Sequence, residues 1–121
     1  MSEPHILRLR KRAQFLFVRR GKTERRKTIV VQAARRGDDK PHIGQGFTAT
    51  KKIGNAPTRN RAKRRLREAA RQLLPEYGVS GADYVFIARL DTATTRWQRL
   101  LDDMEKALIS LREPLQNPPK P

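Results

Sequence analysis

The chain lacks cysteine and has only two histidines among its 121 residues. Without cysteine, neither a disulfide scaffold nor a thiolate metal site can form. His5 and His42 have no obvious carboxylate partner in the sequence, and no metal-ligand spacing, nucleophile elbow or complete phosphate-binding glycine loop is present. We therefore expect no catalytic residue and no metal site in the protein itself, which argues against a stand-alone nuclease.

Long hydrophobic runs are missing as well. None approaches the roughly 20 residues that a membrane-spanning helix needs, and the N-terminus shows neither an apolar signal core nor a lipidation motif. These features predict a cytoplasmic protein that does not enter a membrane. The length suits one modest core, so we predict a single domain over residues 1–113 and a disordered, proline-rich tail over residues 114–121.

Acidic residues are scarce. The sequence has 12 Asp and Glu against 28 Lys and Arg, which gives a formal net charge of +16. Repulsion among so many like charges opposes folding and favours a polyanionic partner. An anionic membrane is the competing polyanion, but the missing apolar segments favour a nucleic acid.

The densest basic stretch runs from Lys51 to Arg71, with nine Lys or Arg and one acid, Glu68. Its apolar residues recur at helical spacing and form one stripe: Ala62, Leu66, Ala69, Ala70 and Leu73. An adjacent stripe is polar and cationic: Asn60, Lys63, Arg64, Arg67 and Arg71. Such a helix docks one face on a core and presents the other to a phosphate backbone. Unpaired cations at this density repel one another, so a merely solvated face explains them poorly.

The remaining pattern predicts the element order α-β-β-α-β-α, with helices over about residues 6–20, 57–74 and 94–111 and strands over 28–34, 43–50 and 84–90. The first two strands are expected to form a hairpin. For the central helix, Asn55 or Thr58 is the expected cap, and Pro75 with Gly78 is expected to end it. A parallel crossover through this helix would ordinarily be right-handed.

The aromatic residues allow two interpretations. Phe15 and Phe17 either pack in the core or line a groove in which a ring stacks on unpaired bases. Trp97 opens an apolar stripe on the last helix, which indicates a packing anchor rather than a stacking platform.

Four segments together resemble the protein subunit of bacterial ribonuclease P. TKKIGNAPTRNRAKRRLREAAR (residues 50–71) is similar to the family's signature, an RNR-x-KR-x-x-R block after KK-x-GNA. LRKRAQFLFVRRG, IGQGFTATKK and GADYVFIAR follow the family's first helix, its Gly-Phe strand and its next strand, in the same order. The match covers about residues 6–111.

The resemblance implies an α+β fold, a small α/β sandwich like domain 2 of ribosomal protein S5, with an uncommon left-handed crossover into and out of the basic helix. It implies a protein cofactor of a ribonucleoprotein whose RNA subunit, with Mg²⁺, removes the 5′ leader of precursor tRNA. The expected partners are the ribonuclease P RNA and precursor tRNA, with one protein monomer per RNA. A structural RNA-binding protein of the ribosomal type is the alternative, because its composition and fold would be the same.

Carried over residue by residue, the resemblance assigns two groups of side chains. One is expected to face the catalytic RNA: Lys51, Lys52, Arg59, Asn60, Arg61, Lys63, Arg64, Arg67 and Arg71. The other is expected to form a cleft, with the face of the sheet, for the single-stranded leader: Arg12, Phe15, Phe17, Phe47 and Arg89.

Overall fold

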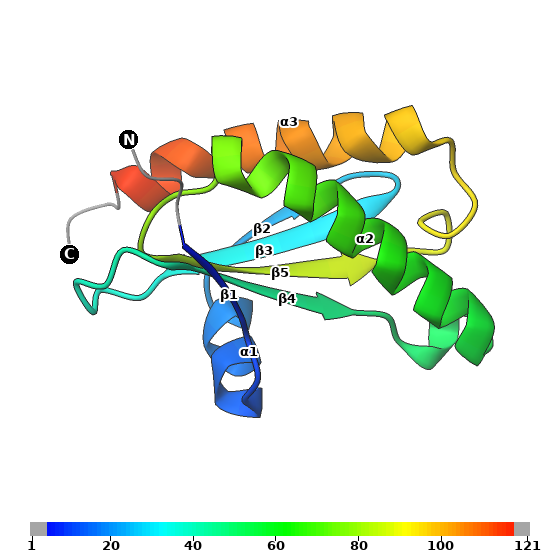
Figure 1. Ribbon diagram of the computed structural model, residues 1–121, viewed down its shortest axis with the longest axis horizontal. Helices are drawn as coiled ribbons and strands as arrows, with labels where there is room; N and C mark the ends of the chain where they lie inside the picture. Colours follow the sequence, from blue (N-terminus) through cyan, green and yellow to red (C-terminus); the bar gives the residue numbers. More distant parts are fainter. Residues whose placement is uncertain (1–4, 118–121) are drawn as a thin grey trace.

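A computed structural model describes residues 5–117 of the chain and shows one five-stranded sheet with three helices (Figure 1). The strands follow the spatial order β1-β4-β5-β3-β2. They are β1 (Ile6–Arg8), β2 (Lys22–Arg25), β3 (Ile29–Arg35), β4 (Ile43–Thr48) and β5 (Ala82–Ala88). The helices are α1 (Arg12–Arg19), α2 (Ala56–Tyr77) and α3 (Trp97–Gln116), and a 3-10 turn, η1 (Lys51–Ile53), precedes α2. The predicted α+β class is confirmed.

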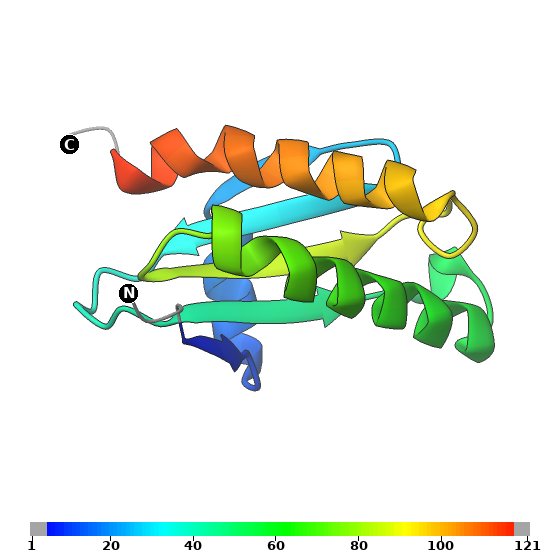
Figure 2. The same ribbon diagram turned by 45° about the horizontal axis from the view of Figure 1, so that its top comes forward.

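The helices lie on both faces of the sheet. α2 and α3 cover one face and α1 packs on the other (Figures 1 and 2). The side chains of β5 alternate between these two faces. Tyr84 and Phe86 join the large core under α2 and α3. Val85 joins a small cluster with Leu9 and Val18 under α1. No helix in residues 5–117 is long and apolar enough to cross a bilayer.

The connection from β4 through α2 to β5 is a left-handed crossover. β4 and β5 are parallel neighbours. In Figure 2, α2 lies in front of the sheet, both strands point to the right and β5 lies above β4. When the strands are turned to point upward, β5 lies to the left of β4, which is the left-handed arrangement. The general preference for right-handed crossovers does not hold here, and the hand is the one that the family resemblance implies.

Three predictions about the sheet were wrong. β3 and β4 form no hairpin, because β5 lies between them and pairs with both. The first predicted helix begins only at Arg12, since residues 6–8 form strand β1 beside β4. Residues 22–25, for which no strand was predicted, form β2, which is antiparallel to β3. Both missed strands are short edge strands, and their pairing depends on partners distant in sequence.

Two prolines that were expected outside helices lie inside them. α2 continues past Pro75 to Tyr77, where the Tyr77 hydroxyl bonds the Glu105 carboxylate on α3 (2.9 Å). α3 continues past Pro114, because Leu115 is buried in the core and Arg35 donates to the carbonyl oxygens of Leu115 and Gln116 (both 3.2 Å). Residues 114–116, which were expected in the tail, are therefore helical, and residues 118–121 of the predicted tail lie outside the described part of the chain.

Candidate RNA-binding surfaces

Helix α2 begins with a side-chain cap. Asn55 accepts a hydrogen bond from the Thr58 N–H (3.0 Å), and Pro57 occupies the first turn, where no N–H is needed. This decides between the two capping candidates in favour of Asn55. Gly54, with φ of 145°, turns the chain from η1 into the helix in a conformation that other residues rarely adopt.

The apolar stripe of α2 packs on the sheet as the periodicity predicted. Ala62, Leu66, Ala69 and Ala70 are fully buried, and Leu73 packs against the same core. The docked stripe fixes the rotation of the helix, and this rotation turns the cationic stripe to the surface.

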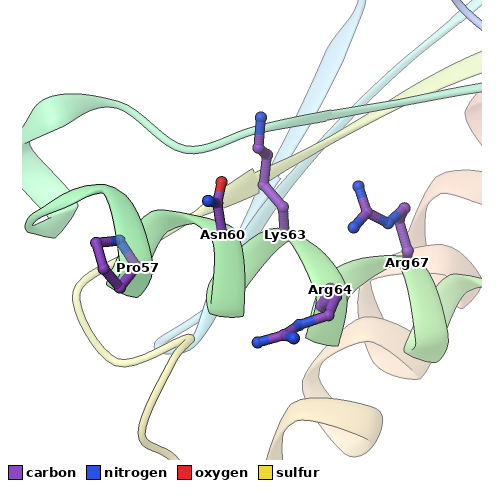
Figure 3. Close-up of a pocket in the computed structure, with 5 residues that line it drawn as sticks. All are labelled: Pro57, Asn60, Lys63, Arg64 and Arg67. Carbon is purple, nitrogen blue, oxygen red and sulfur yellow. The ribbon is translucent and has the colours of Figure 1, made fainter.

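One hollow on α2 is lined by the residues at the centre of the cationic stripe. Its lining consists of Pro57, Asn60, Lys63, Arg64 and Arg67. Figure 3 shows these residues on successive turns of the helix, with the polar ends of Asn60, Lys63, Arg64 and Arg67 projecting away from the ribbon. The three cations can only donate hydrogen bonds, whereas the neutral amide both donates and accepts them. Such a hollow matches phosphate oxygens.

The other predicted cations of α2 differ in their surroundings. Arg61 is exposed. Arg59 donates to the Gly54 carbonyl (3.2 Å) and so helps to fix the start of the helix. Arg71 is exposed but forms an ion pair with Glu68, donating from Nε to Oε2 at 3.1 Å. The pair partly neutralises this end of the stripe.

Arg65 has a structural role that its neighbours lack. Its guanidinium donates to the carbonyl oxygens of Thr92 (2.6 Å) and Thr95 (2.5 Å) and lies 5.7 Å from the centre of the Trp97 ring. Burial, followed by the charge of Arg61, lowers the pKa of Arg65, although the guanidinium remains protonated. Arg65 therefore attaches α2 to the segment between β5 and α3. Sequence spacing gives no signal for this role.

We predict that Arg65→Ala and Arg64→Ala have opposite signatures. Arg65→Ala leaves two carbonyl oxygens without their charged donor and should lower the free energy of unfolding by about 1–3 kcal/mol. Arg64→Ala should leave stability nearly unchanged and lower the salt dependence of RNA binding. Urea denaturation and salt-dependent RNA titration of both variants measure the two effects. Equal stability of the two variants would contradict this assignment.

A second basic hollow lies at the end of the sheet where β5 meets η1. Lys27, Lys52 and Arg89 line it together with Leu90, whose side chain is 70% exposed, and four further residues. The structure thus brings together Lys52, predicted to face the catalytic RNA, and Arg89, predicted to face the leader. Lys51 is exposed beside them in η1.

Phe15 lies on the opposite face of the sheet, with α1. It packs against the Leu9, Val18 and Val85 cluster and remains half-exposed. Its ring lies directly on Gly46, where a Cβ would come within 2.6 Å of the ring. The absence of a side chain at Gly46 is what allows the ring to lie so close to the sheet. Phe17 and Arg12 are exposed on the same helix.

Phe47 does not join Phe15 in one cleft. The two rings lie on opposite faces of the sheet, because Phe47 follows Gly46 in β4 and side chains alternate along a strand. Phe47 stacks on Phe86 in the core under α2, with ring centres 5.4 Å apart. The predicted grouping of Phe47 with Phe15 does not form, because the two rings belong to different segments whose side chains lie on opposite faces of the sheet.

Acidic and histidine side chains do not gather anywhere in the part of the chain that the structure describes. Residues 5–117 contain no group of three or more His, Asp or Glu that could hold a metal ion. The carboxylates of Asp83 and Asp103 are buried and bonded within the fold, the first to Arg36 and the second to Thr28. These contacts account for the two carboxylates as parts of the scaffold.

Comparison with known proteins identifies the chain's relatives. The ribonuclease P family model matches residues 4–112. A ribonuclease P protein component from Caulobacter vibrioides is 55% identical over 111 residues, which are 89% of this chain and 74% of that protein. Another from Ruegeria pomeroyi is 49% identical, covering 88% of this chain and 86% of that one. The chain belongs to the ribonuclease P protein family.

The fold agrees with this membership. A solved structure of the ribonuclease P protein from Thermotoga maritima superposes with a TM-score of 0.71 at 27% identity, covering 85% of this chain and 96% of that one. The resemblance seen in the RNR block is confirmed, and with it the predicted role as a protein cofactor of ribonuclease P in tRNA 5′ processing. The RNR-x-KR-x-x-R pattern allows any residue at the position of Arg65. This agrees with the contacts of Arg65, which are made within the protein.

Proposed function

We propose that α2 binds the catalytic RNA of ribonuclease P through the hollow lined by Asn60, Lys63, Arg64 and Arg67. The observation that carries this proposal is the grouping of these side chains in one basic hollow on a helix whose other face is docked. The remaining predicted residues extend the same surface along the helix and onto η1: Lys51, Lys52, Arg59, Arg61 and Arg71.

The proposed substrate surface is on the α1 side. α1 lies across the sheet from α2 (Figure 1), so the enzyme's own RNA and the substrate need not compete for one patch. We assign the single-stranded leader to Phe15, with Arg12 and Phe17 on the same helix and Arg89 at the end of β5. A half-exposed ring stacks on any base, so this surface holds RNA with little sequence preference.

The positive charge of the protein accounts for its proposed part in the reaction. A large RNA must bring a second polyanion, the precursor tRNA, next to its own phosphates, and a protein with net charge +16 lowers that repulsion. Residues 5–117 contain no group of three or more His, Asp or Glu that could hold an ion by themselves, and Mg²⁺ readily binds phosphate oxygens. We therefore assign Mg²⁺ to the RNA. We also propose that one monomer binds each RNA, in the cytoplasm.

Reconstitution tests the proposal. Folded protein mixed with its cognate ribonuclease P RNA should restore cleavage of precursor tRNA at an Mg²⁺ concentration too low for the RNA alone. Protein alone should not cleave. No stimulation with the cognate RNA would reject the proposal and favour an RNA-binding protein of the ribosomal type.

We predict that Phe15→Ala weakens binding of leader-bearing substrate more than binding of mature tRNA. Removing one base-stacking interaction should reduce the affinity of the reconstituted holoenzyme for precursor tRNA by about tenfold, from a stacking contribution of about 1–3 kcal/mol. Competition binding with both RNAs measures the difference. Leu16→Ala is the matched control, because it removes an exposed apolar side chain of α1 that carries no aromatic ring. Equal losses for both RNAs would assign Phe15 to the core alone.

A further inference from the structure

A third hollow lies between α2 and the start of α3, next to the basic hollow. Arg64, Arg65, Glu68 and Trp97 line it, and carbon atoms form most of its wall. Arg64 also lines the basic hollow, so the two are contiguous along the helix. A mostly apolar hollow beside a row of cations is unusual for a surface that binds only phosphates.

The indole of Trp97 provides a fixed aromatic surface in this hollow. The side chain is half-buried and packs against the core, as expected of an anchor, while the rest of it remains at the surface. Its remaining surface lines the hollow. Arg65, held by the Thr92 and Thr95 carbonyl oxygens, lies over the ring and keeps it in place. Rings held in this way provide stacking surfaces for unpaired bases.

Glu68 supplies the second part of the site. It is the only acid between Lys51 and Arg71, and its side chain is 46% exposed. Hydrogen bonds from Arg71 lower the pKa of Glu68, so the carboxylate is ionised at neutral pH. Both of its oxygens accept from Arg71, so a base edge with two N–H donors would replace Arg71 on the carboxylate; the Arg71 side chain is 72% exposed and can move into solvent. An anion among cations repels phosphate, whereas a base edge with N–H donors would pair with it.

We propose that this hollow binds one unpaired guanine base of the RNA that docks on α2. The base packs on the indole surface that lines the hollow and on the Arg65 guanidinium beside it. The Glu68 carboxylate accepts from the guanine N1–H and N2–H groups in place of Arg71, and Arg64 contacts the adjoining phosphate. Guanine fits because its Watson–Crick edge carries two neighbouring donors for a carboxylate, which uracil and adenine lack. This inference rests on the proposed docking of catalytic RNA on α2.

Trp97 is the only tryptophan in the chain, so its fluorescence reports on the site directly. The probes are oligouridylates of equal length that contain one internal guanosine, one inosine or none. Inosine keeps the N1–H and lacks the N2 amino group. The guanosine probe should quench Trp97 and bind about tenfold more tightly than the all-uridine probe, from a base contact of about 1.4 kcal/mol, with inosine between them. Equal affinity and equal quenching for all three probes would overturn the proposal.

Glu68→Gln separates base recognition from charge. Removing a negative charge from a cationic surface strengthens general attraction to RNA, so charge alone predicts tighter binding of every probe. Base recognition predicts that the guanosine probe loses its advantage while the all-uridine probe binds no worse. The matched control is Glu113→Gln, which removes the same charge from α3. At 1.5 Å per residue, Glu113 lies about 24 Å along the helix from Trp97. A retained guanosine preference in Glu68→Gln would also overturn the proposal.

The cleavage assay distinguishes this inference from the function on which it rests. If the wild-type protein stimulates cleavage but shows no guanosine preference, the base site is wrong and the docking role remains. If the wild-type protein does not stimulate cleavage, the proposed docking of catalytic RNA on α2 is wrong, and no RNA remains to supply the guanine.

Discussion

The double substitution Arg64→Ala and Arg67→Ala is expected to weaken assembly with ribonuclease P RNA more than any other pair of exposed changes. Both guanidinium groups line the basic hollow on α2. Removing one phosphate-binding cation should lower the slope of log affinity against log salt by about 1, so the double variant should lower it by about 2. The decrease in affinity should be larger at low salt than at high salt. Filter binding or fluorescence anisotropy over a range of salt concentrations measures the slope.

Lys106→Ala with Arg112→Ala is the matched control for this experiment. Both residues are exposed on α3, and the double change removes the same charge. General electrostatics predicts that the two double variants behave alike. A specific docking surface on α2 predicts that only the first shows the full decrease in slope. Similar slopes for the two variants would show that RNA binds to the total charge of the protein and not to this hollow.

Arg36→Ala is expected to destabilise the fold more than the loss of any cation on the proposed RNA surfaces. Arg36 and Asp83 form a buried ion pair at 2.6 Å, with 11% and 4% of their side chains exposed. Arg36 also donates to the carbonyl oxygens of Lys40 (3.0 Å) and His42 (2.6 Å), so it attaches the loop before β4 to the start of β5. Removing it leaves Asp83 as an uncompensated buried charge. We expect the free energy of unfolding to fall by about 3–5 kcal/mol, measured by urea denaturation.

Two variants test the cause of that destabilisation. Asp38→Ala removes only the exposed arm of the Arg36 network, which is bonded at 3.0 Å, and should have a much smaller effect. Asp83→Asn in the Arg36→Ala background removes the unpaired charge and should restore part of the stability. If Arg36→Ala costs less than about 1 kcal/mol, the ion pair does not hold the loop.

Helix α2 and the second basic hollow are connected by the scaffold between them. Arg65 attaches α2 to the segment over residues 92–95, and that segment follows Arg89 and Leu90 at the end of β5. Thr92 also bonds the Thr28 carbonyl (2.6 Å), which ties the same segment to the start of β3. These buried contacts fix the relative positions of the docking helix and of the second basic hollow. Loosening Arg65 should therefore disturb both.

The sequence could predict the elements whose signals are local. The helical period of α2 and the apolar run of β5 each lie within one continuous stretch, so propensity and periodicity were enough to find them, and they narrowed the cap of α2 to two residues. The short edge strands β1 and β2 gave no such signal. Their existence depends on hydrogen bonds to β4 and β3, which lie elsewhere in the chain.

The sequence by itself determined the partner class and the basic helix that we propose as the docking surface. An excess of cations, a helical period and the RNR block are properties of residue order, and the structure did not alter them. Only the tertiary structure decided which side chains act together. Arg64 and Arg65 are neighbours in sequence, yet the carbonyl groups that bind Arg65 come from 27 and 30 residues away. Phe15 and Phe47 belong to one family pattern, yet the sheet separates them, because the face of a side chain is set by strand pairing and by the side on which a helix packs.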